Sequence, residues 1–267
     1  MTNSTVSSES APRSSTNDES LLTSSSPTPR CSQSIFLTLS SFLSRHPRFK
    51  NIHFESIGPA IMSGRVVALD VNPINPNEFY VAYASGGVWH TKDNGISFMP
   101  IMDNAPTQNI GEIKVNWSTK EIWVGTGENN SSRSSYAGIG ILKSNNNGKT
   151  WTHHGLSETH HIGKIIIDSE NPEHIIVGST GPLYSKGEER GVFISKDNGE
   201  TWNKTLYINN ETGIIDMVQV PESPEIIYAS TWEKERKAWN FSGSGKSSGI
   251  YKSIDSVSYT HLRAHET

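Results

Sequence analysis

The sequence contains almost no cysteine, no long apolar run and no strong net charge. Its single cysteine, Cys31, excludes an intrachain disulfide and a cysteine-rich metal site. No apolar run is long enough to span a bilayer as a helix. A net charge of −4 over 267 residues does not indicate a nucleic-acid-binding protein. Helical periodicity of useful length is also missing, which argues against a mainly helical fold.

What the sequence does contain is a repeat. The segments TKDNGISF, SNNNGKTW and SKDNGETW begin at Thr91, Ser144 and Ser195, and an incomplete copy begins at Ser253. By these numbers the starts lie 53, 51 and 58 residues apart, and a nearly fixed period of this size indicates a repeat protein. The incomplete fourth copy predicts that the chain is a fragment of a longer repeat domain.

Each octapeptide predicts a tight turn followed by a strand. The Asp or Asn at its third position can accept hydrogen bonds from backbone N–H groups further along the turn. The Gly at its fifth position permits a positive φ, and the aromatic residue at its eighth can anchor a hydrophobic layer. We assign this structural role to Asp93, Gly95, Asn146, Gly148, Trp151, Asp197, Gly199 and Trp202.

Strand-like runs rich in Val, Ile, Tyr and Trp surround every turn. The runs before the turns are 65–71, 79–84 and 87–91; 110–116, 121–127 and 140–144; 162–168, 174–179 and 191–195; and 213–220, 226–231 and 249–253. With one strand after each turn, every repeat has four strands, which we call A, B, C and D. Four short antiparallel strands in about fifty residues are typical of a β-propeller blade. The predicted fold is therefore all-β: a partial propeller of three blades and most of a fourth.

The octapeptide resembles the Asp-box of BNR-repeat propellers. The segments GPAIMSGRVVALDVNP, GTGENNSSRSSYAGIG and STWEKERKAWNF are similar to the sortilin-type, glycosyl-hydrolase-like branch of these proteins, and the resemblance extends over residues 54–255. It implies a seven-bladed parent propeller in an extracytoplasmic or secreted protein. The remaining blades are then expected partners of this chain. The Asp-box itself implies a fold and no particular activity.

Composition divides the chain into three parts. Residues 1–50 are rich in Ser and Thr and predict a disordered leader, in which the weakly apolar segment 34–43 is either the remnant of a signal peptide or a short helix. Residues 51–255 form the propeller fragment. After Asp255 the repeat is lost, because Val257 and Thr260 replace the expected Gly and aromatic residue, and we interpret 256–267 as a non-native tail.

In a propeller the A–B and C–D turns lie on one face, whereas the B–C and D–A connections lie on the other. The B–C loops 128–139, 181–190 and 232–248 are long and irregular, and loops of this kind commonly carry function. Aromatic rings suit sugar or peptide surfaces, and arginine suits carboxylates. The candidate ligand-binding residues on this face are Arg65, Arg133, Tyr136, His161, Arg190, Trp232, Arg236 and Trp239.

Structural roles compete with these assignments. Arg65 can be an ion-pair partner inside the channel, Glu128 can cap its own loop, and Glu188 belongs to a charge run that solvent can accommodate. Trp239 can pack as part of a loop plug. His160 and His161 would face opposite sides of a strand, so they are a poor metal pair, and we predict neither a metal nor a cofactor.

Two functions remain open. The first is a binding module whose partner is a peptide or a carbohydrate. The alternative is a sialidase- or glucanase-like glycoside hydrolase, which needs two carboxylates at a set separation. The sequence identifies no such pair, and Glu128, Asp216 and Glu188 are weak candidates for it.

Overall fold

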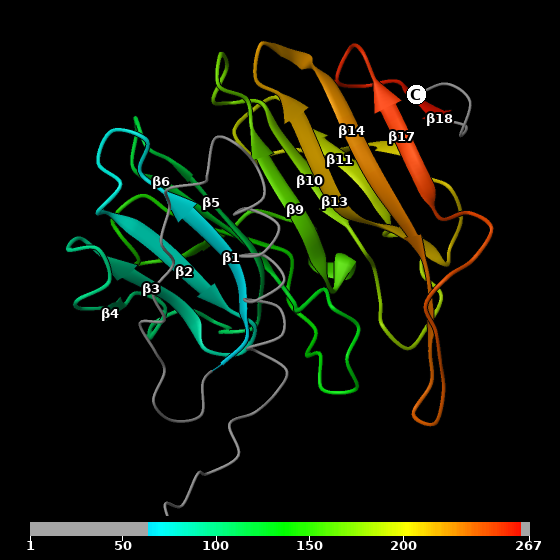
Figure 1. Ribbon diagram of the computed structural model, residues 1–267, viewed down its shortest axis with the longest axis horizontal. Coiled ribbons are helices and arrows are strands. Elements are labelled where there is room, and N and C mark those ends of the chain that lie inside the picture. The colour runs from blue at the N-terminus through cyan, green and yellow to red at the C-terminus, as the bar shows by residue number, and fades with distance from the viewer. Residues whose placement is uncertain (1–63, 263–267) are drawn as a thin grey trace, which may run out of the picture. The chain divides into compact units, whose positions relative to one another are not determined.

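The computed structural model describes residues 64–262. It contains four four-stranded antiparallel sheets, each with its strands in chain order (Figure 1). The predicted all-β partial propeller is therefore confirmed. The predictions for the leader 1–50 and for segment 34–43 lie outside the described residues. In residues 64–262 no helix is long and apolar enough to cross a membrane.

Each sheet is one blade, and its strands A to D follow the repeat. Blade 1 comprises β1 (Val66–Val71), β2 (Phe79–Tyr83), β3 (Gly87–Thr91) and β4 (Met99–Pro100). Blade 2 comprises β5 (Ile110–Asn116), β6 (Glu121–Thr126), β7 (Ile141–Ser144) and β8 (Thr152–His153). Blade 3 comprises β9 (Ile162–Ile167), β10 (Ile175–Ser179), β11 (Gly191–Ser195) and β12 (Asn203–Leu206). Blade 4 comprises β13 (Thr212–Val220), β14 (Ser223–Glu233), β17 (Gly249–Ser253) and β18 (Tyr259–Leu262). A short 3₁₀ turn, η2 (Ser157–Thr159), precedes β9, and the hairpin β15 (Glu235–Arg236) with β16 (Phe241–Ser242) lies between β14 and β17.

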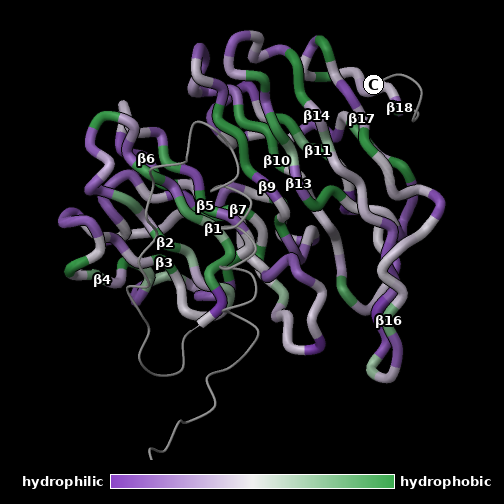
Figure 2. The backbone as a smooth tube through the Cα atoms, in the orientation of Figure 1, coloured by the Kyte–Doolittle hydropathy of each residue, from purple (hydrophilic) through white to green (hydrophobic). Residues whose placement is uncertain are grey.

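The hydrophobic core lies between the blades. Successive side chains of a strand point to opposite faces of the sheet, so a sheet between two neighbours is buried on both faces. Every residue of β10 and β11 is accordingly buried, whereas most of β1 is not. Three apolar clusters join blade 1 to blade 2, blade 2 to blade 3, and blade 3 to blade 4. Figure 2 shows the hydrophobic residues along the sheets and the polar residues in the loops.

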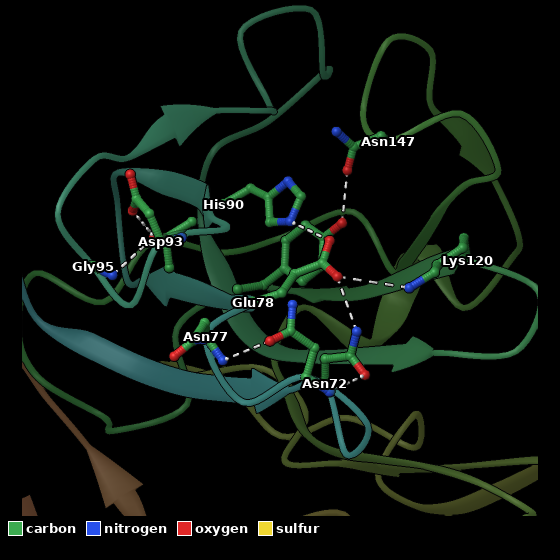
Figure 3. Close-up of polar contacts among 11 residues, drawn as sticks. Asn72, Asn77, Glu78, His90, Asp93, Gly95, Lys120 and Asn147 are labelled. Carbon is green, nitrogen blue, oxygen red and sulfur yellow. Dashed lines mark hydrogen bonds and ion pairs between the residues drawn. The ribbon is translucent and has the colours of Figure 1, made fainter.

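The turn between strands C and D has the same geometry in the first three blades. In blade 3 the Ser195 hydroxyl donates to Asp197 Oδ1 at 2.7 Å and accepts from the Gly199 N–H at 2.8 Å. The backbone N–H of Thr201 then donates to Asp197 Oδ1 at 2.9 Å. Equivalent bonds form around Asp93 and Asn146, and Figure 3 shows the first of these turns with Asp93 and Gly95. We call these segments box turns.

The box turns of blades 2 and 3 each hydrogen-bond to the preceding blade. The Trp151 indole N–H donates to the Ile101 carbonyl at 3.2 Å, and the Trp202 indole N–H donates to the His154 carbonyl at 2.7 Å. Both tryptophans immediately precede the D strand of their own blade. The aromatic residue of the box turn therefore contributes a hydrogen bond between blades in addition to apolar packing.

Blade 4 differs from the sequence prediction because it has a D strand, β18, which pairs with β17 over four residue pairs. Asp255 Oδ1 accepts backbone N–H bonds from Val257 at 2.9 Å and Ser258 at 2.6 Å, so the turn closes without a glycine. Strand pairing uses backbone groups, and those groups are present in this segment whatever its side chains are.

Candidate functional site

Three long loops lie together at one end of the blades. They are the B–C connections of blades 2, 3 and 4, and in Figure 1 they project toward the lower edge with the β15–β16 hairpin. A cleft lies between the loops of blades 3 and 4, and we call it the interloop cleft. Its lining residues are Leu183, Tyr184, Ser185, Lys186, Arg190, Glu211, Lys234, Glu235 and Arg236. An adjoining hollow adds Glu233, Ser242 and Ser244 and shares Glu211, Lys234 and Glu235.

Arg190 is a predicted ligand-binding residue whose side chain holds its own loop in place. Its guanidinium donates to the carbonyl oxygens of Thr180, Pro182 and Ser185. The residue is fully buried, and burial lowers the pKa of its guanidinium to about 10. Arg190 therefore supplies positive charge to the cleft, while most of its donors are already used by the loop backbone.

A buried polar cluster lies beside the cleft. Arg65 Nη2 donates to Glu128 Oε2 at 2.5 Å, and Glu128 Oε1 has no hydrogen-bond partner in the described part of the chain. Lys234 Nζ hydrogen-bonds to Ser131 Oγ, which links the loop of blade 4 to that of blade 2. His161 is also buried. The structure thus places two predicted site residues, Arg65 and Glu128, in an ion pair with each other.

Because His161 is buried, we expect the folded protein to lose stability in acid. Burial lowers the pKa of its imidazole to about 4, and the positive charge of Lys234 contributes in the same direction. The unfolded chain, with an ordinary histidine pKa near 6.5, binds this proton more tightly, so folding weakens as the pH falls from about 6.5 to about 4. We expect this group to remove about 2 to 3 kcal/mol of the free energy of unfolding across that interval.

Urea unfolding at several pH values tests this expectation. His161→Gln should flatten the pH dependence between 6.5 and 4, whatever its effect on stability at pH 7. His153→Gln, which makes the same substitution at an exposed histidine, is the matched control. An unchanged slope in His161→Gln would contradict the prediction.

The long loops carry several aromatic side chains, of which Tyr184 lines the cleft. The Tyr184 hydroxyl donates to the Arg133 carbonyl at 2.9 Å, so the exposed ring of Tyr184 bridges the loops of blades 2 and 3. Trp232 packs edge-to-face on Phe241 at 6.1 Å between ring centroids, and Arg236 lies 4.9 Å from the Phe241 ring. At the tip of the β15–β16 hairpin Trp239 is 80% exposed. Tyr136 is exposed on the blade 2 loop.

The three candidate catalytic carboxylates have different surroundings. Asp216 lies on inner strand β13 with its side chain 61% exposed, and its Oδ1 is 3.9 Å from Lys164 Nζ. Glu128 is paired with Arg65, and Glu188 is exposed. Within residues 64–262 no hydrogen bond joins any two of these three side chains. Nor do three His, Cys, Asp or Glu residues of the described chain gather as metal ligands would.

A row of ion pairs on the inner strands includes Asp216. Asp70 of β1 contacts Lys114 of β5 at 3.0 Å, and Glu112 of β5 contacts Lys164 of β9 at 2.8 Å. β-Bulges near the start of β1, β5 and β13 shift the register at this end of the inner strands. We call these pairs the inner ladder. Its charges link neighbouring blades, so Asp216 belongs to an arrangement that has a structural explanation.

A second buried cluster lies at the opposite end, next to the first box turn (Figure 3). The Glu78 carboxylate accepts from Asn72 Nδ2 at 2.9 Å and lies 3.1 Å from His90 Nε2 and 3.8 Å from Lys120 Nζ. Burial alone would raise the pKa of Glu78, but its hydrogen bonds to Asn72 and His90 lower it overall. Burial lowers the pKa of His90, which favours the neutral ring. Because Lys120 belongs to blade 2, this cluster joins blades 1 and 2.

The sequence analysis did not select Lys234, Ser131 or Glu211. Lys234 lies inside the run EKERK, which has the pattern of a solvated charge run. Ser131 adopts a positive φ of 56°, an unusual backbone conformation for serine that no sequence pattern reveals. Glu112 carried a weak signal, since it interrupts an otherwise apolar strand beside Lys114.

Comparison with solved structures shows which known fold this chain resembles. No family model matches the chain. An ancestral GH74 enzyme superposes with a TM-score of 0.55 at 17% identity, over 74% of this chain and 25% of that one. The GH74 xyloglucanase from Xanthomonas campestris gives 0.52 at 14% identity, over 73% and 29%. The fold is therefore a β-propeller similar to that of these GH74 structures.

Sequence comparison agrees with this result at low identity. The chain is 27% identical over 161 residues to the "Probable oligoxyloglucan-reducing end-specific xyloglucanase" of Neosartorya fischeri, which covers 57% of this chain and 18% of that protein. The chain thus spans less than a third of the length of these relatives and solved structures.

Proposed function

We propose that this chain is part of an extracytoplasmic β-propeller that binds a carbohydrate at the interloop cleft. The observation that carries the proposal is a cleft lined with carboxylates, hydroxyls, cations and the exposed ring of Tyr184, with Trp239 exposed on the same loop as the cleft residues Lys234, Glu235 and Arg236. Aromatic faces pack against the C–H faces of sugars, and charged side chains hydrogen-bond to hydroxyl groups. The GH74-like fold favours a glycan over a peptide as the ligand.

Binding of xyloglucan oligosaccharides, followed by calorimetry, tests the proposal. Trp239→Ala and Tyr184→Ala should each weaken binding about tenfold, because each removes an exposed ring from the surface that the glycan would contact. Tyr184→Phe should weaken binding less, since it keeps the ring and removes only the hydroxyl that reaches Arg133.

Ile74→Ala is the control for nonspecific loss of apolar surface. Ile74 is 90% exposed in the A–B turn of blade 1, at the end of the blades opposite to the cleft. This variant should bind as the unaltered chain does. Binding of peptides but of no xyloglucan, cellulose or uronan fragment would contradict the glycan assignment, as would equal affinity in all four variants.

Glycoside hydrolysis is the second candidate, and the GH74-like fold favours it. It would require two carboxylates on either side of the scissile bond, one of them protonated. In the structure Glu128 lies against Arg65 and Asp216 lies near Lys164, and in the described part of the chain neither is paired with a second carboxylate. If the protein hydrolyses aryl glycosides, and Glu128→Gln or Asp216→Asn abolishes that activity, glycoside hydrolysis would become the preferred function over glycan binding alone.

A further inference from the structure

Lys234 is a buried lysine that has no acidic partner. It lies between β14 and β15 with 6% of its surface exposed, and it lines both the interloop cleft and the adjoining hollow. Its Nζ hydrogen-bonds to Ser131 Oγ from the blade 2 loop and lies 4.9 Å from the Trp232 ring centroid. No ion pair within residues 64–262 involves it. The amine is therefore oriented by a hydroxyl and is not neutralised by a carboxylate.

The surroundings of Lys234 favour the neutral amine. Burial lowers the pKa of its ammonium to about 7, and the charge of Arg190 contributes in the same direction. Arg190 cannot move away, because three loop carbonyls hold its guanidinium. His161, another titratable neighbour, carries little charge at neutral pH, since burial and the Lys234 charge lower its pKa to about 4. A desolvated lysine beside a second cation is one of the known arrangements that make a lysine nucleophilic.

We propose that Lys234 is a reactive amine that captures small hydroxyaldehydes in the interloop cleft as imines. The Nζ lone pair forms a bond to the aldehyde carbon, and the carbonyl oxygen gains a proton as the nitrogen loses one. The resulting carbinolamine takes up a proton and loses its hydroxyl as water, which leaves a protonated imine. Ser131 holds Nζ in place and is the nearest hydroxyl for moving these protons.

The lining of the cleft favours an aldehyde that carries hydroxyl groups. Glu211 and Glu235 present carboxylate oxygens, and Tyr184 and Ser185 present hydroxyls, all of which can hydrogen-bond to a polyol. The open-chain form of a reducing sugar belongs to this class. The inference concerns the cleft of the proposed function, but it requires only the aldehyde and not an intact glycan.

Reductive labelling of the full chain tests the inference. The protein is incubated at pH 7 with glycolaldehyde and cyanoborohydride, which reduces the imine to a stable secondary amine, and the digest is examined by mass spectrometry. Lys234 should be labelled about ten times faster than the exposed Lys149, which serves as an internal reference in the same digest. Lys234→Arg should abolish labelling at this position and leave the rate at Lys149 unchanged.

Ser131→Ala separates reactivity from folding. It should lower the Lys234 rate several-fold relative to Lys149, while far-UV circular dichroism remains that of the unaltered chain. Labelling of Lys234 that is no faster than that of Lys149, or that appears only in urea, would overturn the inference. A borohydride-reduced xyloglucan oligosaccharide has no aldehyde, so its binding reports on the proposed function alone and can fail or succeed independently.

Discussion

Lys164→Met is expected to lower the free energy of unfolding by about 3 to 5 kcal/mol at pH 7, because it leaves the buried Glu112 carboxylate without its cation. Glu112 is 5% exposed, and Lys164 Nζ is 2.8 Å from its Oε2. Burial raises the pKa of Glu112 even with Lys164 present, although Lys164 opposes the shift. The charged carboxylate therefore depends on this partner, and the loss should shrink as the pH falls and Glu112 takes up a proton.

The Lys164→Met prediction has two controls. Lys186→Met breaks a pair of similar length, 2.7 Å to Glu211, but the two side chains are 66% and 39% exposed, so little change is expected. Adding Glu112→Gln to Lys164→Met removes the buried charge and should restore much of the stability. Chemical unfolding of all three variants at pH 7 and pH 5 measures these differences. A Lys164→Met variant as stable as Lys186→Met would show that the Glu112–Lys164 pair contributes nothing to folding.

Gly148→Ala should be far more destabilising than the same change at Gly95. Both glycines occupy the fifth position of a box turn with similar φ, 79° and 83°, so the backbone cost of about 1 to 2 kcal/mol is shared. A Cβ at Gly148 would overlap the Ile101 carbonyl of the preceding blade, whereas a Cβ at Gly95 would have its nearest atom at 3.5 Å. The overlap should add about 1 to 3 kcal/mol.

Thermal unfolding of the two alanine variants measures this difference. Because the local turn is the same, the comparison isolates the contact between blades. Gly199→Ala, whose Cβ would approach the Trp123 ring at 2.7 Å, should resemble Gly148→Ala. Equal losses at Gly95 and Gly148 would show that the box turn matters only within its own blade.

The blades could be predicted from the sequence because their determinants are local and repeated. Asp93, Asn146 and Asp197 recur at one position of the box turn, and each accepts the same turn bonds. The strand β18 could not be predicted, because Val257 replaces the glycine of the repeat and the pairing depends on backbone groups alone. The nature of the last residues and of the leader 1–50 stays a prediction.

The candidate site could be predicted only as a face of the molecule. Loop length and composition indicated three loops that the structure places at one end of the blades, but sequence does not show what an arginine in a loop binds. Arg190 donates to its own backbone and Arg65 to Glu128, whereas Arg236 lines the cleft. Lys234 was not predicted because its reactivity depends on Ser131 and Arg190, which lie far from it in the sequence and are brought near by the packing of blades.

The indole bonds of Trp151 and Trp202 have a consequence for how such chains can change. Both acceptors are main-chain carbonyls, one belonging to an isoleucine and the other to a histidine. A hydrogen bond to a main-chain carbonyl tolerates almost any residue at the acceptor position. Neighbouring repeats can therefore diverge in sequence, or be exchanged by recombination, while the hydrogen bond between them is kept.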